Sequence, residues 1–253
     1  MKSIELGSII TVILFGGGLL GMLARRVLPE NHLSDETKDL ITVSMAVIGT
    51  LSALVLGLLL SSASSSFGAR NQEVMEISAD MVRLDRLLRR YGPATDESRV
   101  LLRRYVAMKK QDLFPETATG SPNVDNPQTI ALLETLQNGL LELKPANNKQ
   151  QWLQSQALQL AVDVAKTRWA LAQQSANAIP IPFLVAMVFW LRILFVSFGL
   201  FAPRNPTAIA ALLLSAMAVS AAVGLILEME SPLQGIVRVS SAPMHHALQE
   251  ISR

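Results

Sequence analysis

The side chains that carry most enzyme chemistry are scarce in this sequence of 253 residues. It has no cysteine and three histidines, which excludes disulfides, thiolate metal sites and cysteine nucleophiles. His32 stands alone in a polar loop, and the adjacent His245 and His246 neither share a helix face nor have a carboxylate at ligand spacing. There is no glycine-rich phosphate loop, no Ser/His/Asp spacing and no carboxylate pair inside an apolar segment. We therefore expect no enzyme activity, no metal and no cofactor.

Three charged residues stand inside or beside apolar segments. Arg192 lies near the middle of one, where an arginine in lipid costs at least about 2.5 to 3.5 kcal/mol and should face protein, a carboxylate or water. It is either an anion-attracting or gating charge, or a structural bond to a carbonyl or another helix. Glu228 and Glu230 close another apolar segment at the membrane edge. They either form a cation-attracting ring in an oligomer or are simply solvated.

A stripe at helical spacing supplies a further set of candidates in residues 40–65. Along it a hydrophobic band gives way to hydroxyl groups. This pattern is typical of a pore lining, but also of a helix interface, because serine, glycine and alanine let helices pack closely in lipid. The pore-lining candidates are Thr50, Leu54, Leu58, Ser61 and Ser65.

The composition indicates a membrane protein. Hydrophobic residues make up 50% of the chain and charged residues 17%, and the mean hydropathy is +0.36, whereas soluble domains are about 25% charged. The net charge is only +2 with the two signs interleaved, so no nucleic acid is implied. We predict transmembrane helices at about residues 4–24, 40–62, 180–201 and 207–228, each long enough to cross a bilayer.

The first apolar segment is interpreted as an uncleaved membrane helix, because a signal peptide would carry a stronger positive region than Lys2 alone. Gly17 and Gly21 within it form a small-xxx-small pair that predicts a close helix contact. The loop after it offers a cap for the following helix in residues 34–37, and a tight loop at residues 202–206 precedes the fourth segment.

The second helix is predicted to continue far beyond the membrane, because no proline interrupts residues 40–91. Its outer half carries an apolar seam at alternating steps of three and four, which needs a partner helix. The natural partner is the helix that starts near residue 149 and carries the same spacing. The two seams are Val74, Ile77, Met81, Leu84, Leu88 and Tyr91, and Leu153, Ala157, Leu160, Val164 and Leu171.

Two further helices are expected between these seams. Residues 96–113 form one, with Val100 and Tyr105 facing inward and Lys109 outward. The second begins at Asn126 and Pro127, an N-cap followed by proline at the first helical position. The expected fold is therefore all-α, with four transmembrane helices and a helical extramembrane domain inserted between the second and third. The parts are residues 1–66 with two spans, 67–178 as the soluble domain, 179–230 with two spans and 231–253 as a C-terminal tail.

Several segments resemble the bestrophin-like family of bacterial membrane proteins. They are LG at 56–57 through FGAR at 67–70, LDRLLRRYGP at 84–93, FGLFAPRN at 198–205 and LEMESPLQGIVRVSSAP at 227–243. The family is similar to bestrophins, which are pentameric ion channels with four membrane helices, a helical cytosolic domain between the second and third, and a pore lined by the second. The order of segments here fits that plan.

The resemblance implies a homo-oligomer, a pentamer, that conducts small inorganic ions. It places the chain in the lipid bilayer of the bacterial inner membrane, with the helical domain and both termini cytoplasmic. Leu54 and Leu58 would form the hydrophobic neck, with Thr50 a turn earlier. Bestrophin necks carry bulky residues including phenylalanine, so a neck of leucine and threonine would be wider and wetter.

The function expected from these observations is that of an oligomeric ion channel. The alternative is a non-conducting membrane scaffold or sensor whose helical domain binds a partner. The apolar seam and the absence of an ion-selective motif from the sequence favour this alternative.

Overall fold

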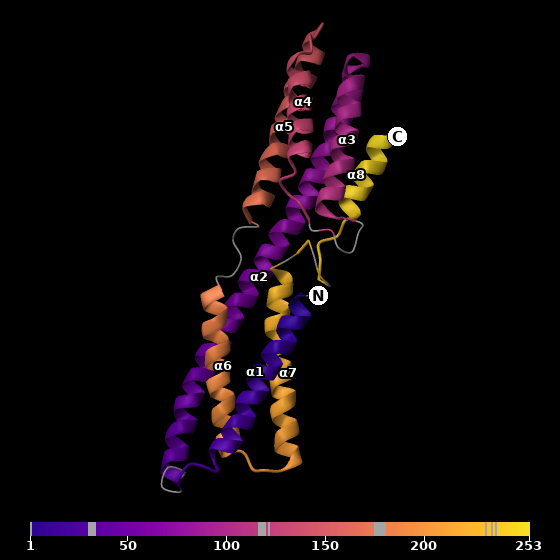
Figure 1. The fold of residues 1–253 in the computed structure, drawn as a ribbon. Helices are drawn as coiled ribbons and strands as arrows, with labels where there is room; N and C mark the ends of the chain where they lie inside the picture. The colour runs from indigo at the N-terminus through magenta and orange to yellow at the C-terminus, as the bar shows by residue number, and fades with distance from the viewer. Residues whose placement is uncertain are drawn as a thin grey trace. The chain divides into compact units, whose positions relative to one another are not determined.

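The structure, a computed structural model, describes residues 2–29, 34–115, 120, 122–174, 181–230, 232–233, 235 and 237–253. These residues contain helices and no strand, which confirms the all-α prediction. The helices are α1 (Lys2–Ala24), α2 (Asp35–Tyr91), α3 (Asp96–Leu113), α4 (Pro127–Leu141), α5 (Asn148–Gln174), α6 (Ile181–Phe201), α7 (Pro206–Met229) and α8 (Ala242–Ser252), with a short 3-10 helix η2 (Pro93–Thr95) (Figure 1).

The chain forms two compact units. Unit 1 comprises Met1–Ser65 and Ile179–Ser231, and unit 2 comprises Ser66–Ala178 and Pro232–Arg253. Helix α2 is 57 residues long and contributes its first part to unit 1 and its second part to unit 2. In the part of the chain that the structure describes, four helices are long and apolar enough to cross a membrane: α1, α2, α6 and α7.

The helix starts follow from their capping residues. Ser34 accepts a hydrogen bond from the backbone N–H of Thr37, and α2 begins at Asp35, about five residues before its apolar segment. At the start of α7, the side chain of Asn205 accepts from the N–H of Ala208, with Pro206 at the first helical position. Asn126 caps α4 in the same way, with its side chain accepting from the N–H of Gln128, as the sequence predicts.

In unit 1, α1 and α6 approach each other backbone to backbone. A Cβ atom added at Gly21 would overlap the backbone of Val196, and one added at Gly199 would overlap the backbone of Gly18. One added at Gly17 would lie 3.2 Å from Cγ of Arg192. The helix contact predicted from Gly17 and Gly21 is therefore confirmed. Two helices can approach each other this closely only where the residues in contact have no side chain.

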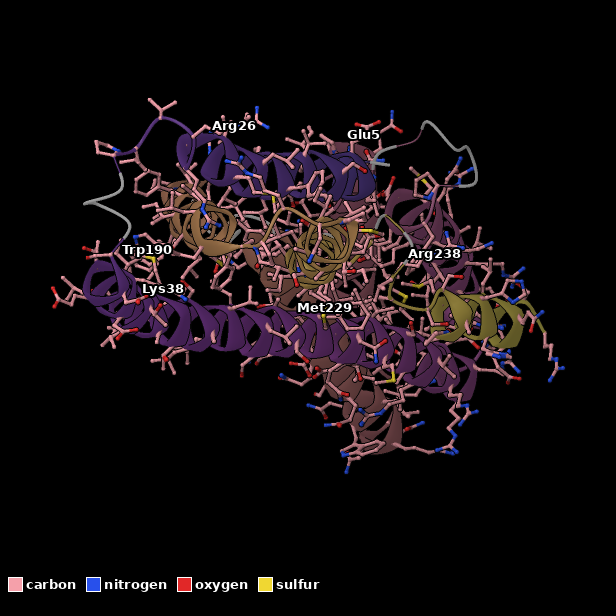
Figure 2. All side chains as sticks on the ribbon, turned by 90° about the horizontal axis from the view of Figure 1, so that it is seen from below. Glu5, Arg26, Lys38, Trp190, Met229 and Arg238 are labelled. Atoms are coloured by element: carbon pink, nitrogen blue, oxygen red, sulfur yellow. The ribbon has the colours of Figure 1, made fainter. Side chains whose placement is uncertain are left out.

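The core of unit 1 is made by α1, α6 and α7, against which the first part of α2 packs. The charged ends of these helices lie outside it: in Figure 2 the labelled Glu5 and Arg26 mark the two ends of α1, and Lys38 lies near the beginning of α2. The buried apolar side chains are Ile10, Leu14, Met22, Met187, Leu191, Leu194, Phe195, Leu212, Ala216 and Val223.

Two arginine–carbonyl hydrogen bonds tie the end of α1 to the turn between α6 and α7. Arg25 donates from Nη1 to the carbonyl of Ala202 at 3.2 Å, and Arg204 donates from Nη2 to the carbonyl of Met22 at 3.1 Å. Each guanidinium thus satisfies a carbonyl at the end of the opposite helix, where no intrahelical donor is left. The bonds also place Arg25 and Arg204 at the same end of unit 1.

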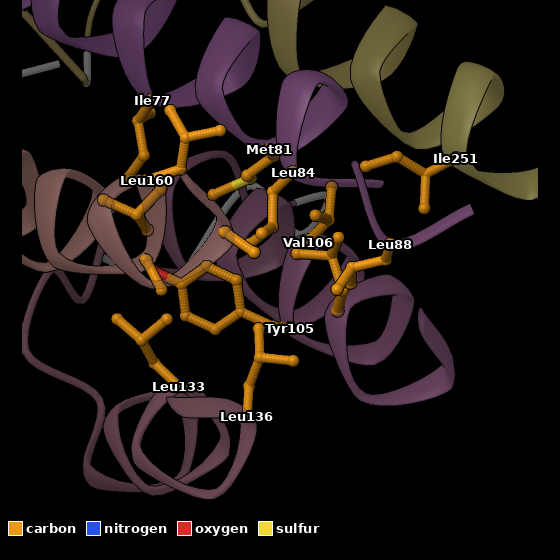
Figure 3. Close-up of a cluster of buried hydrophobic side chains, with 14 of the residues drawn as sticks. Ile77, Met81, Leu84, Leu88, Tyr105, Val106, Leu133, Leu136, Leu160 and Ile251 are labelled. Atoms are coloured by element: carbon orange, nitrogen blue, oxygen red, sulfur yellow. The ribbon is translucent and has the colours of Figure 1, made fainter. Parts of the chain in front are cut away.

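Unit 2 has its own core, built on the predicted seam. Ile77, Met81, Leu84 and Leu88 of α2 are 0 to 1% exposed and meet α3, α4 and α5 (Figure 3). All five predicted seam residues of α5 are also buried. Both seam predictions are confirmed by this burial, which stabilises the unit by about 1.5 to 3 kcal/mol per large apolar side chain.

Residues 231–253, predicted only as a tail, contribute a helix to this core. Met244 and Ile251 of α8 are fully buried in the same cluster as the α2 seam. The hydroxyl of Ser78 on α2 approaches the sulfur of Met244 at 3.9 Å while donating to the carbonyl of Val74 at 2.6 Å. Helix α8 is 11 residues long, too short to be stable unless its apolar face is packed.

Helix α3 is rotated relative to the sequence prediction. Val100, predicted inward, is 60% exposed, whereas Lys109, predicted outward, is fully buried beside Tyr105 and Val106. The prediction for Val100 and Lys109 was therefore wrong, because it assumed that a lysine must face water. The ammonium of Lys109 instead donates to the carbonyl of Val124 at 2.8 Å.

A polar layer around Lys109 fixes the segment before α4. The carboxylate of Asp112 accepts from Asn126 at 2.7 Å and from the hydroxyl of Thr129. Arg168 of α5 pairs with Asp125 at 3.0 Å. The pKa of Lys109 is lowered to about 8, mainly by burial. The charge of Arg168 also lowers this pKa, whereas the carboxylates of Asp112 and Asp125 raise it.

A buried carboxylate, that of Asp85 of α2, connects the seam helix to α3. Its two oxygens accept from Arg89 at 3.1 Å and from Arg99 at 2.9 Å. The Arg99 pair joins two helices, and removing one partner of a buried pair is costly because it leaves the other charge uncompensated.

We expect Gly21→Ala to lower the stability of the protein, because the new Cβ would overlap the backbone of Val196. Overpacking of this kind costs about 1 to 3 kcal/mol, and more where backbone must move. The measurement is the apparent unfolding temperature of the purified protein in detergent. Gly224→Ala on α7 is the matched control, since a Cβ there meets nothing within 4 Å. Equal unfolding temperatures of the two variants would contradict the close contact.

A second expectation concerns Lys109 and pH. Because its folded pKa of about 8 lies below its ordinary value of 10.5, the unfolded chain binds more protons between these two values. The contribution of Lys109 to stability therefore rises as pH increases from about 8 to about 10. We expect the unfolding temperature of wild type, relative to that of Lys109→Met, to increase over this interval.

The control for this measurement is Lys149→Met, which removes an exposed lysine from the first turn of α5. This variant measures the effect of removing a lysine that is not specific to the buried position. A wild-type to Lys109→Met difference that stays constant over the same interval would show that Lys109 titrates at its ordinary pKa.

Candidate functional site

The first part of α2 has one packed face. Met45, Ile48, Leu56 and Leu59 lie against the unit 1 core. Ala63 on the same face is fully buried. A helix turns by about 100° per residue, so these positions fall on one side of the cylinder.

The five candidates from the sequence lie on the opposite face. Leu54 and Leu58 are 60% and 63% exposed, and Thr50, Ser61 and Ser65 are exposed as well. The hydroxyl of Thr50 donates to the carbonyl of Ala46 at 2.8 Å, and its oxygen can still accept a hydrogen bond. The structure thus brings all five residues together on a single face that no helix of unit 1 covers.

This open face distinguishes α2 from the other three apolar helices. Only 6% of the residues in its most apolar stretch are buried, compared with 33% in α1, 33% in α6 and 28% in α7. The other helices bury much of their apolar surface against one another, whereas α2 contributes one side only. No helix of unit 1 covers the remaining surface of α2 among the described residues.

Arg192 lies on a different face of α6 from the one that meets α2. Leu194 faces α2: its side chain would lie 4.0 Å from a Cβ added at Gly49. The aliphatic part of the Arg192 side chain instead lies against Gly17 of α1. The Arg192 side chain is exposed, and within the described residues it has neither a hydrogen bond nor an ion pair. The structure therefore does not bring Arg192 together with the five candidates on α2.

The two carboxylates at the end of α7 differ in their environment. Glu228 is 7% exposed, so the solvated interpretation does not hold for this residue. Glu230, the C-cap residue of α7, is half-buried, and its N–H donates to the carbonyl of Ile226 at 3.1 Å. Both belong to unit 1.

The histidines do not form a metal site in the part of the chain that the structure describes. His245 and His246 of α8 are exposed, and their rings are 6.4 Å apart between centroids. No group of three or more His, Cys, Asp or Glu side chains comes together among the described residues. His32 lies outside the described residues.

Comparison with known families identifies the chain. The family model of the bestrophin-like domain matches residues 12–244. The chain belongs to the bestrophin-like family. Among the curated proteins, no match is found.

Solved structures agree in fold with this bestrophin-like chain. A tryptophan-to-alanine variant of a bacterial bestrophin homolog from Klebsiella pneumoniae superimposes with a TM-score of 0.71 at 13% identity, covering 99% of this chain and 97% of that one. A leucine-to-threonine variant of that homolog gives 0.68 at 14% identity, covering 96% and 97%. A structure described as a membrane protein, with a proline replaced by alanine, gives 0.69 at 14%, covering 96% and 97%. Identities this low establish the fold alone.

Sequence reasoning missed two features of the bestrophin-like α2. Ser52, on the packed face, is 3% exposed, and its hydroxyl has no hydrogen-bond partner. A Cβ added at Gly57, on the open face, would meet no atom within 4 Å. Only the structure reveals these properties, because both depend on which side of α2 meets the other helices.

The two faces of α2 can be tested directly, because the chain has no cysteine of its own. We expect a thiol reagent to modify Leu58→Cys at least about tenfold faster than Ala63→Cys, since buried thiols are inert. Mass spectrometry of the purified protein gives both rates. Denatured samples, in which both cysteines should react equally, are the control. Equal rates in the folded protein would overturn the assignment of the faces.

Proposed function

We propose that this chain is one subunit of an oligomeric ion channel whose pore is lined by the open face of α2. The observation that carries the proposal is the 6% burial of the apolar stretch of α2, which leaves an amphiphilic face without a partner inside the chain. A stretch this apolar is stable in a membrane only if lipid, further copies or a narrow aqueous path cover it.

In this proposal, α1, the first part of α2, α6 and α7 are the four membrane spans. The helical residues 67–178 form a soluble domain inserted between the second and third spans. Residues 231–253 lie on the same side of the membrane as this domain. The domain and both termini are cytoplasmic, and the membrane is the bacterial inner membrane. These assignments rest on the lengths and apolar composition of the helices and on the family membership.

The chemistry of the open face fits a hydrophobic neck followed by a hydrated vestibule. Leu54 and Leu58 would form rings around the axis, with Thr50 one turn before them and Ser61 and Ser65 beyond. Hydrophobic constrictions gate by losing their water, and leucine rings leave a wider opening than aromatic ones. The hydroxyls would replace part of the hydration shell of an ion that leaves the neck.

Copies of the same chain are the proposed partners, together with the lipid bilayer and small inorganic ions. The resemblance to bestrophins favours a pentamer, in which each α2 contributes one fifth of the pore. The uncovered guanidinium of Arg192 would act as a gating or anion-attracting charge, and Glu228 and Glu230 as a cation-attracting ring at the end of α7.

A second candidate function, a membrane scaffold or sensor, is favoured by one specific surface. Trp152, Val162 and Trp169 of α5 are 54 to 58% exposed in unit 2. Exposed aromatic residues are common where a protein binds a partner. In that case the helical domain would bind another protein, and the membrane part would serve as its anchor.

Ion flux in proteoliposomes separates the two functions. We expect wild type to conduct and Leu58→Ala to change the flux by about tenfold, because a smaller side chain would widen the neck and keep it hydrated. Chloride, sodium and potassium are compared as the permeant ions. Leu214→Ala on α7 is the matched control, since Leu214 is 66% exposed and Leu58 is 63% exposed.

If the reconstituted oligomer shows no flux at any pH or membrane potential, the chain is not a channel and the scaffold function is favoured. If the flux changes equally in Leu58→Ala and Leu214→Ala, the channel function is supported, but α2 does not line the pore.

A further inference from the structure

Three glycines of unit 1 have a steric reason that the structure makes visible. At Gly17, Gly21 and Gly199, a Cβ would crowd the neighbouring helix, so a glycine is required for close packing. Such contacts compensate for the cost of glycine inside a helix, which is about 1 kcal/mol relative to alanine.

Gly57 has no such reason within the chain. It lies deep inside the 57-residue α2 helix, is exposed, and a Cβ there would meet nothing within 4 Å. Its backbone has ordinary helical geometry, since the only glycines with a positive φ among the described residues are Gly92 and Gly235. Gly16 and Gly224 also have an open Cβ position, but both are half-buried, whereas Gly57 is exposed on the open face of α2.

The position of Gly57 connects it with the candidate neck. It precedes Leu58 directly, follows Leu54 by three residues and precedes Ser61 by four, so it shares their open face. Helical side chains lean toward the N-terminus and cover the preceding turn. Ala53, one turn earlier, is exposed, and residue 57 as glycine has no side chain that could cover the backbone of that turn.

We propose that Gly57 determines the width and the hydration of the α2 neck. It forms a gap between the Leu54 and Leu58 rings in which water contacts the backbone carbonyls, so that a passing ion keeps part of its hydration shell there. A carbonyl oxygen has two lone pairs, and the intrahelical bond uses only one of them. Any side chain at residue 57 fills the gap and covers this acceptor. The inference rests on the proposed pore and identifies the residue that sets its permeability.

The alternative explanation of Gly57 is a contact between copies, in which a neighbouring helix takes the place of the missing side chain. The two explanations differ in what can reach the residue. A neck position is in contact with water and is reached by charged reagents, whereas a packed glycine is shielded and cannot be enlarged without loss of the oligomer.

The experiment uses the absence of native cysteine. Gly57→Cys protein is reconstituted in liposomes, and its flux is measured before and after a charged, membrane-impermeant methanethiosulfonate reagent. We expect the reagent to lower the flux by about tenfold or more, since an added charged group fills a narrow neck. Gly16→Cys on α1 is the matched control, because a Cβ at Gly16 also meets nothing within 4 Å.

A second pair of variants tests size alone. Gly57→Leu should lower the flux by about tenfold or more while the protein elutes at the same size as wild type, and Gly57→Ala should have a smaller effect. Gly16→Leu should leave the flux unchanged.

Each outcome supports or overturns the inference. If wild type conducts but the reagent has no effect on Gly57→Cys, Gly57 is not in the pathway. If Gly57→Leu elutes at a smaller size than wild type, the residue is a contact between copies and the inference is also wrong. If wild type itself does not conduct, the proposed function fails, and the inference that rests on it fails with it.

Discussion

The need to satisfy every backbone polar group without water governs unit 1. In lipid a single segment can do this only as a helix, because all its N–H and C=O groups then bond within the segment. Because these groups are used within each helix, the apolar helices are joined by close packing and by side-chain bonds at the helix ends. Between α1 and α6 the joining residues are glycines, and at the end of α1 the arginine–carbonyl bonds of Arg25 and Arg204 satisfy what the helix ends leave open.

The same constraint explains why α2 differs from its neighbours. Helices α1, α6 and α7 bury their small and apolar faces against one another, and α2 adds only the side with Met45, Ile48 and Leu59. Beyond Ser65 the same unbroken helix changes character, because Val74 and Ile77 are fully buried in unit 2. One continuous helix therefore serves two environments, with a lipid-compatible face in one unit and a water-excluded seam in the other.

The sequence allowed most of this fold to be predicted, because apolar runs and seam spacing depend on local residue order. The burial of Leu84 and Leu160 and the capping by Asn126 follow from that order. The orientation of α3 does not, since Lys109 is buried only because the carbonyl of Val124 comes from a distant segment. Helix α8 was missed because its 11 residues gain stability only from tertiary packing. In the candidate site, the shared face of Leu54 and Leu58 was predictable from spacing, but the side of α2 that stays open was not.

The place of α8 in the chain constrains the order in which the protein is assembled. Met244 and Ile251 complete a core whose other members come from residues 77–164, yet α6 and α7 are synthesised between them. During translation the first part of unit 2 therefore emerges without α8, and its seam residues remain partly uncovered until the last two apolar helices have left the ribosome. Exposed apolar surface of this kind favours aggregation, so a chaperone or rapid membrane insertion is needed during that interval.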